Sequence, residues 1–162
     1  MIDEIDRQIL TILQQNARTS NAEIARQVEM APSAVLERIR RMEAKGVIQG
    51  YEVRINPETV GLGMVAFVAV ASSDMSGELK TATMLGEIPE VQEVHHVAGE
   101  DCFVLKVRVK DARALGHLLR ERIGTIPSVR STRTTVVLET VRESSQLSLE
   151  VPREAVEEEV LP

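Results

Sequence analysis

Apolar side chains recur with helical spacing over the first part of the chain. Within residues 3–46, three such groups predict the buried sides of three helices: Ile5, Ile9 and Leu13; Ile24, Ala25 and Val28; Val35, Ile39 and Met42. Ser20 and Glu23 have the spacing of a capping box and predict the start of the second helix. Pro32 predicts the first turn of the third helix, where a missing amide costs nothing, and Gly46 predicts its end.

Beyond residue 60 the pattern changes to two similar β-α-β units. We expect the first as strand 63–72, helix 76–87 and strand 91–98, and the second as strand 102–110, helix 111–124 and strand 129–141. Both units contain an Ile-Pro-x-Val turn before their second strand. A doubled β-α-β pattern predicts a ferredoxin-like antiparallel sheet with both helices on one face. Residues 49–55 predict an extended linker before it.

The predicted strands differ in polarity, and this bears on assembly. The strand from Phe103 to Val109 is apolar at its odd positions and charged at Lys106 and Arg108, which is typical of a half-buried strand. The run Met64–Ala71 is apolar on both faces. Because the two helices can cover only one face of the sheet, the other face needs a cover, and a second copy of the chain is the simplest one. Cover by the N-terminal region or the tail of the same chain is the alternative.

Composition and charge narrow the class of protein. The net charge is −6, but residues 143–162 carry six acidic and one basic side chain, whereas residues 33–45 carry four basic and two acidic ones. The longest apolar run is too short to cross a bilayer, and the first residues lack the basic start of a signal peptide. With one cysteine, Cys102, the chain cannot form an internal disulfide. We therefore expect a cytoplasmic protein.

Residues 21–45 have the spacing of a helix-turn-helix, whose second helix enters the major groove of double-stranded DNA. Three side chains at the start of that helix are expected to reach base edges: Ser33, Ala34 and Glu37. Three basic side chains are expected to bind phosphates: Arg38, Arg41 and Lys45. The alternative is a plain three-helix bundle with solvated arginines.

Several motifs, taken together, resemble the Lrp/AsnC (leucine-responsive regulator, feast/famine) family. They are Ile-Asp-Arg-Gln-Ile-Leu (5–10), Asn-Ala-Arg-Thr-Ser-Asn (16–21), the runs 37–43 and 46–51, Gly99, and the strands 104–109 and 132–137. The resemblance covers about residues 2–142. It departs from the family pattern at Ala31, where a serine often caps the third helix.

The resemblance implies an α+β protein and a domain organisation. We expect a winged-helix-like helix-turn-helix domain over residues 1–48 and a hinge strand or linker over 49–60. A ferredoxin-like effector and dimerisation domain would follow over 61–142, then an acidic tail over 143–162. The implied function is a transcriptional regulator that binds double-stranded DNA as a homodimer, assembled further into tetramers or octamers. A metabolite-binding regulatory subunit without DNA binding is the alternative.

The resemblance also implies a small-molecule effector, such as an amino acid, near residues 99–103. Many family members carry Gly, an acid, an aromatic, a second acid and an aromatic there. Here Cys102 replaces the second acid, and an acid stands one residue early. The expected effector contacts are Gly99, Glu100, Asp101, Cys102, Thr132 and Thr134. Ordinary strand packing is the alternative for the two threonines.

Other chemistry finds little support in the sequence. His95 and His96 are adjacent on a predicted strand, so they point to opposite faces and cannot chelate one metal ion together. Cys102 has no nucleophile-base pattern around it, and we expect no enzyme activity, metal or cofactor. Phe103 alone cannot supply the aromatic platform of an RNA-recognition sheet.

Overall fold

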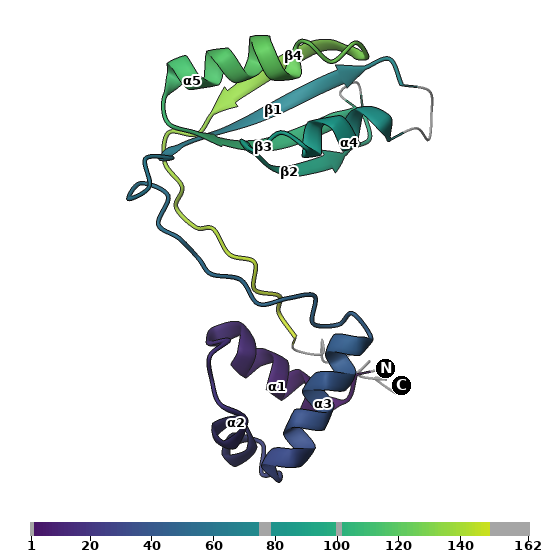
Figure 1. The fold of residues 1–162 in the computed structure, drawn as a ribbon, viewed down its shortest axis with the longest axis vertical. Helices are drawn as coiled ribbons and strands as arrows, with labels where there is room; N and C mark the ends of the chain where they lie inside the picture. The colour runs from purple at the N-terminus through teal and green to yellow at the C-terminus, as the bar shows by residue number, and fades with distance from the viewer. Residues whose placement is uncertain (1, 75–78, 100–101, 150–162) are drawn as a thin grey trace, which may run out of the picture. The chain divides into compact units, whose positions relative to one another are not determined.

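The chain divides into two compact units, each with its own core. The computed structural model describes residues 2–74, 79–99 and 102–149 (Figure 1). The first unit contains the described residues up to Val53 together with those from Glu143 onward, and the second runs from Arg54 to Arg142. The segment 143–149, expected as part of a separate tail, therefore belongs to the N-terminal unit. Among the described residues, no helix is long and apolar enough to span a bilayer.

Of the hinge strand or linker expected over residues 49–60, the structure shows a linker without a strand. Residues 49–56 have no regular secondary structure in the described chain, and residues 57–61 form a turn. The reason is physical: an extended segment becomes a strand only when its backbone pairs with another strand, and a pattern of side chains cannot supply that partner.

Three helices form the first unit: α1 (Glu4–Gln15), α2 (Asn21–Gln27) and α3 (Pro32–Ala44). They enclose a core of seven buried side chains, all from the three predicted apolar groups: Ile9, Ile24, Ala25, Val28, Val35, Ile39 and Met42. Ile5 and Leu13 pack against its edge. The predicted helices and their buried sides are thus confirmed.

The helix caps agree with the sequence in part. Ser20 Oγ accepts a hydrogen bond from the Glu23 amide, but the Glu23 carboxylate binds Arg26 and Gln27 instead of returning to the cap. α3 begins after Ala31 with no side-chain cap, as its sequence predicts. The complete capping box lies at α1, where Asp3 and Asp6 each accept the other's amide hydrogen.

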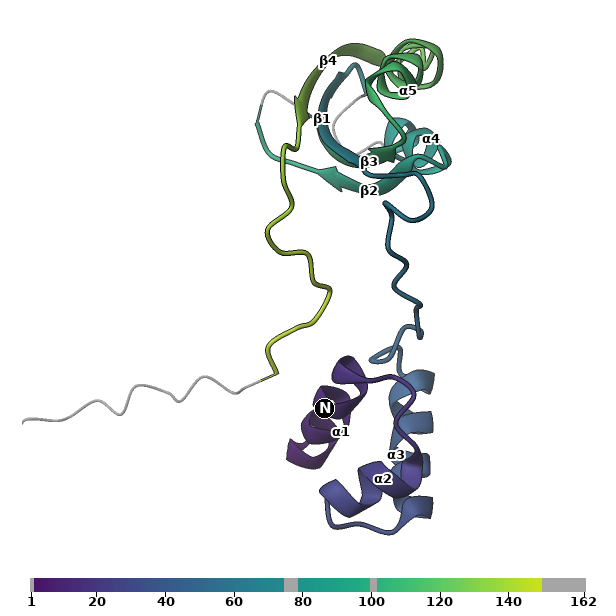
Figure 2. The same ribbon diagram turned by 90° about the vertical axis from the view of Figure 1, so that its left-hand side faces the viewer.

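The second unit has the predicted β-α-β-β-α-β order. Its elements are β1 (Met64–Ser72), α4 (Lys80–Gly86), β2 (Val91–His96), β3 (Phe103–Val109), α5 (Ala112–His117), η1 (Leu118–Ile123) and β4 (Val129–Val136). The antiparallel sheet has the order β2-β3-β1-β4. Both helical segments lie on one face of the curved sheet (Figure 2). The first residues of the expected helix 76–87 lie outside the described part, and the last strand ends five residues earlier than predicted.

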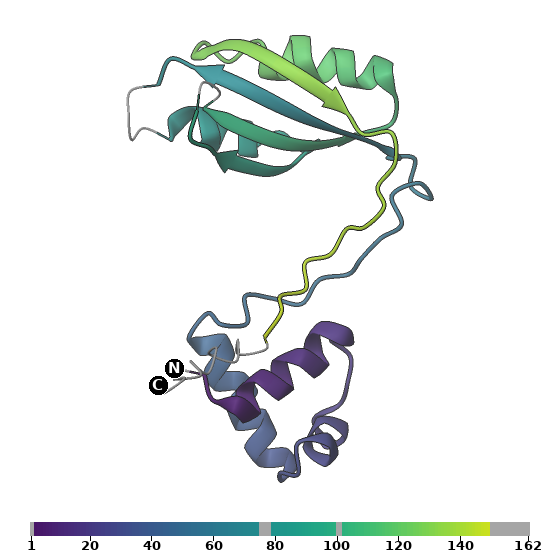
Figure 3. The same cartoon turned by 180° about the vertical axis from the view of Figure 1, so that it is seen from behind.

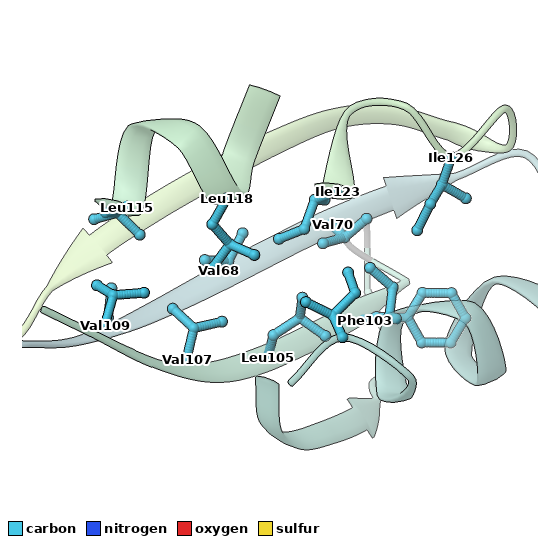
Figure 4. Packing of buried hydrophobic residues seen from close by; sticks show 13 residues of the cluster. Val68, Val70, Phe103, Leu105, Val107, Val109, Leu115, Leu118, Ile123 and Ile126 are labelled. Atoms are coloured by element: carbon cyan, nitrogen blue, oxygen red, sulfur yellow. The ribbon is translucent and has the colours of Figure 1, made fainter. Parts of the chain in front are cut away.

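The register of the central strands places the core between sheet and helices. Val68 pairs with Leu105 on one side and Thr134 on the other, and Val70 pairs with Phe103 and Thr132. Their apolar side chains face the helical layer and form one cluster with Leu115, Leu118, Ile123 and Ile126 (Figure 4). Three of the expected effector residues lie beside the C-terminal half of β1: Cys102, Thr132 and Thr134.

Figure 3 shows the sheet from behind. Because side chains alternate along a strand, the face away from the helices carries the alternate residues of the same strands. Phe67 lies on this face, 43% exposed, between its register partners Lys106 and Thr135. Lys106 Nζ binds Glu93 Oε1 at 3.1 Å. Phe67 thus has polar register partners on both neighbouring strands, and the helices of its own unit lie on the opposite face of the sheet.

Candidate nucleic-acid interface and effector site

The position of α3 is set by its buried stripe. Val35, Ile39 and Met42 are at most 6% exposed and pack in the core of the first unit. With about 3.6 residues per turn, the opposite side of the helix holds Ser33 and Glu37, and both are exposed. Ala34 is partly exposed beside them. The expected base-reading residues therefore share the outer side of α3, at its N-terminal half.

The turn between α2 and α3 is held by its backbone. Glu29 has φ 54°, the left-handed region that side chains other than glycine rarely adopt. The Met30 amide donates to the Ala25 carbonyl at 2.9 Å, which closes the turn behind it. Residues 28–31 thus form a tight connection, as a helix-turn-helix requires.

A buried carboxylate organises the arginines of α3. Asp6 is 1% exposed. Its Oδ1 accepts from Arg38 Nη1 at 2.8 Å, while Arg41 Nη2 donates to Oδ1 and Oδ2 at 3.0 and 2.9 Å. Asp3 Oδ2 accepts from Arg38 Nη1 at 2.6 Å. These four charged side chains tie the start of α1 to the middle of α3.

The network changes the electrostatics of its members. The hydrogen bond from Arg38, assisted by the Asp6 amide, holds the pKa of Asp3 below its ordinary value. The hydrogen bonds that Arg38 donates to the carboxylates of Asp3 and Asp6 raise the pKa of Arg38 above its ordinary value. Asp3 and Arg38 therefore stay charged at neutral pH, and the positive charge of Arg38 is compensated inside the unit.

Arg38, one of the expected phosphate-binding residues, is held by two acids of its own unit. Its side chain is 19% exposed and lies between Asp3 and Asp6, because position 38 borders the buried stripe and faces α1. Arg41 also binds Asp6, but its side chain remains 46% exposed. The side chain of Arg38 is thus mostly enclosed, whereas that of Arg41 is anchored at one side and open at the other.

Arg40 is a residue that the sequence reasoning missed. It is exposed and follows Ser33 and Glu37 at the spacing of seven and three residues, which puts all three on the outer side of α3. This spacing could have identified it. Lys45 caps the C-terminal end of α3 and is exposed. Just beyond, the Tyr51 hydroxyl donates to Glu43 Oε1 at 2.9 Å, and burial, followed by this bond, raises the pKa of Tyr51.

The expected effector loop is described only at its ends. Gly99 has φ 132°, a conformation that favours glycine. Cys102 is half-buried, and its Sγ accepts from the Ser72 amide at 3.4 Å. Glu100 and Asp101 lie outside the described residues. Cys102 is thus hydrogen-bonded to Ser72, the last residue of β1.

The two threonines lie on another strand. Thr132 and Phe103 both pair with Val70, from opposite sides, so β1 separates them by two strand spacings, or about 10 Å. Thr132 is exposed and Thr134 is half-buried. Within one chain, Thr132 and Thr134 are therefore not in contact with the described ends of the loop, because β1 lies between them.

The adjacent histidines point apart, as predicted. His95 Nε2 is 3.0 Å from Glu93 Oε2, on the face of the sheet away from the helices. The ring centroid of His96 is 5.3 Å from that of Phe103, on the helical face. Within the described residues, no group of three or more His, Cys, Asp or Glu side chains could hold a metal ion.

Comparison with known proteins agrees with both units. Residues 2–43 match the AsnC-type helix-turn-helix domain, and residues 65–147 match the Lrp/AsnC ligand binding domain. The leucine-responsive regulatory protein of Escherichia coli K12 is 39% identical over 150 residues, covering 90% of each chain. The transcriptional regulator LrpA of Mycobacterium tuberculosis is 45% identical over 139 residues, covering 86% of this chain and 91% of the other.

A solved structure supports the same assignment. The feast or famine regulatory protein of M. tuberculosis, complexed with L-methionine, has a TM-score of 0.83 and 43% identity, covering 91% of this chain and 99% of that one. A helix-turn-helix unit joined to an α+β ligand-binding unit defines a DNA-binding transcriptional regulator rather than an enzyme. The chain belongs to the Lrp/AsnC family.

Proposed function

We propose that the outer side of α3 reads double-stranded DNA in the major groove. The observation that carries this proposal is the exposure of Ser33, Glu37 and Arg40 on one side of a helix whose other side is locked in a core. Glu37 accepts a hydrogen bond from a cytosine amino group, and Ala34 contacts a thymine methyl group. Arg40, the open side of Arg41, and Lys45 bind phosphates.

A salt series tests this proposal. Anisotropy is measured with the DNA upstream of the protein's own gene and with a scrambled fragment, at several salt concentrations. Arg40→Ala weakens binding to both fragments and lowers the salt slope by about 1, whereas Glu37→Gln changes the preference between them. Arg122→Ala removes an equal charge from the second unit and serves as the control. Equal slopes for Arg40→Ala and Arg122→Ala would reject the assignment.

The second unit is proposed to bind an amino acid through the loop that starts at Gly99. An α-amino acid needs acceptors for its ammonium group and donors for its carboxylate. Glu100 and Asp101 are the nearest acids in sequence to Gly99, and the bound L-methionine of the M. tuberculosis relative makes this ligand class the first to test. Thr132 and Thr134 would complete the site from another copy of the chain, because β1 separates them from the loop within one chain.

Calorimetric titration with each of the twenty amino acids tests the effector. At least one is expected to bind the wild type, and Gly99→Val is expected to weaken it, because valine does not tolerate φ 132°. Gly50→Val, at a glycine outside the second unit, is the matched control. No heat from any amino acid would reject the effector and would leave the DNA proposal unaffected.

The protein is further proposed to act as a homodimer, or as a higher assembly of dimers, with Phe67 at the covered sheet face. A dimer spaces two reading helices along a pseudo-palindromic operator. Phe67→Glu is expected to give a monomer in sedimentation experiments, because a buried charge without a partner is costly. Met84→Glu, on α4 of the same unit, is the control. A Phe67→Glu chain that keeps the wild-type mass would contradict this interface.

A further inference from the structure

The first unit contains a contact between α1 and the C-terminal segment that does not involve the proposed DNA-binding residues of α3. Gln14, in the last turn of α1, meets the backbone of Leu147, 133 residues later in the chain. Gln14 Oε1 accepts from the Leu147 amide at 2.7 Å, and Gln14 Nε2 donates to the Leu147 carbonyl at 3.1 Å. The side-chain amide of Gln14 thus satisfies both backbone groups of one residue.

The side-chain amide of Gln14 makes the pair of hydrogen bonds that the peptide groups of a neighbouring strand would make. A primary amide has the same donor and acceptor as a peptide group, so Gln14 reads an extended backbone rather than a particular side chain. In a third hydrogen bond the roles of side chain and backbone are exchanged: Gln146 Nε2 donates to the backbone carbonyl of Gln14 at 2.9 Å. That carbonyl lies in the last turn of α1, where carbonyl groups have no partner within the helix.

Two residues further along the segment, the side chain of Leu149 forms part of the wall of a groove of about 390 Å³. The other lining residues come from α1 and from the end of α2: Glu4, Arg7, Gln8, Thr11, Ile12, Gln27 and Val28. Leu149 is half-buried, whereas Leu147 is 72% exposed. The segment therefore presents the backbone of one leucine to Gln14 and the side chain of the next to α1 and α2.

We propose that the C-terminal end of α1, with the adjacent groove between α1 and α2, is a binding site for an extended peptide, occupied by residues 146–149 of the same chain. Reciprocal backbone bonds give the affinity, and the Gln-x-x-Leu spacing gives the specificity. The site stands on the DNA-binding unit but apart from the outer side of α3. It ties the C-terminal segment to α1.

Amide hydrogen exchange on the full-length chain tests the site. Gln14→Ala is expected to speed exchange of the Leu147 amide by at least about tenfold, whereas the neighbouring exposed Gln15→Ala leaves it unchanged. Leu147→Pro, which lacks the amide hydrogen, frees the site in the full-length chain. A labelled peptide of residues 143–149 is then expected to bind Leu147→Pro saturably, and at least about tenfold more tightly than the Gln14→Ala, Leu147→Pro double variant.

Two results would overturn the proposal. One is equal exchange of the Leu147 amide in the wild type and in Gln14→Ala, or equal peptide binding with and without Gln14. The other result would show that residues 146–149 bind α1 of a second copy instead of α1 of their own chain. If mixing and refolding Gln14→Ala with Leu147→Pro restores slow exchange at Leu147 of the Gln14→Ala chain, the segment binds a neighbouring copy and not its own chain. These readouts require no DNA, so they stand or fall independently of the proposed function.

Discussion

At the scale of single residues, Asp6 determines how α1 and α3 fit together. It is a buried carboxylate with two arginine partners and the Asp3 amide around it. The helical pattern of the sequence predicts the apolar stripe of α3 but places Arg38 among solvent-facing charges. The pairing with α1 could not be predicted, because it depends on which turn of α1 packs against which turn of α3.

We predict that Asp6→Asn destabilises the first unit strongly. The change removes the charged acceptor of Arg41 and one of the two charged acceptors of Arg38, and losing hydrogen bonds to a buried charged group costs about 1.5–3 kcal/mol. Urea unfolding followed by far-ultraviolet circular dichroism measures the loss. Glu4→Gln, an exposed acid in the same helical turn, is the control and is expected to change the free energy of unfolding by less than about 0.5 kcal/mol. A similar effect of both changes would contradict the role of Asp6.

Asp3 makes the stability of the same unit depend on pH. Its pKa in the folded state is lowered from 3.8 by the Arg38 hydrogen bond, so its ionised form favours folding. This stabilisation is complete above the unfolded pKa and is lost as pH falls through the lower folded pKa. Asp3→Asn keeps a side-chain oxygen for the helix cap but lacks the charge. The difference in urea midpoint between wild type and Asp3→Asn is expected to shrink between pH 5 and pH 2.5, and a constant difference would refute this.

At the scale of elements, the order of helices and strands follows from the apolar periodicity, but backbone irregularities do not. η1 is a π-helical turn continuing α5, and Gly124 ends it with its amide bound to the Leu119 carbonyl at 2.9 Å. The sequence predicts one regular helix over 111–124. Nor does it predict the partner of residues 146–149, because this contact joins segments that are distant in the sequence.

Two glycines of this helical segment are expected to respond oppositely to alanine. A Cβ at Gly124 would lie 2.9 Å from the Leu119 carbonyl oxygen and 3.2 Å from that of Arg120, so the backbone must shift. We expect Gly124→Ala to cost about 1–3 kcal/mol by overpacking. At Gly116 the nearest atom is the flexible end of Arg120, and alanine favours the helix by about 0.5–1 kcal/mol. Thermal unfolding of both variants checks the two signs, and a stabilising Gly124→Ala would contradict the close approach.

At the scale of the whole molecule, the chain passes from the first unit to the second and back again. The sequence predicts a serial order of domain, hinge, domain and tail. It does not predict the return of residues 143–149 to the first unit, because no periodicity marks a segment that binds through its backbone. The division into two cores, by contrast, was accessible, because helical spacing gives way to alternating strands after residue 60.

Two cores without a shared residue predict two separable unfolding events. Ile9→Ala empties the centre of the first core and Leu105→Ala that of the second, where both side chains are fully buried. Each change is expected to lower the stability of its own unit by about 2–5 kcal/mol. Because the side chains lie in different clusters, each variant should move one transition in calorimetry and leave the other in place. The peptide contact at Gln14 lies within the first unit, so its loss should move the same transition as Ile9→Ala, by a smaller amount. If either core variant shifts both transitions equally, the two units fold as one cooperative body and the division into separate cores is wrong.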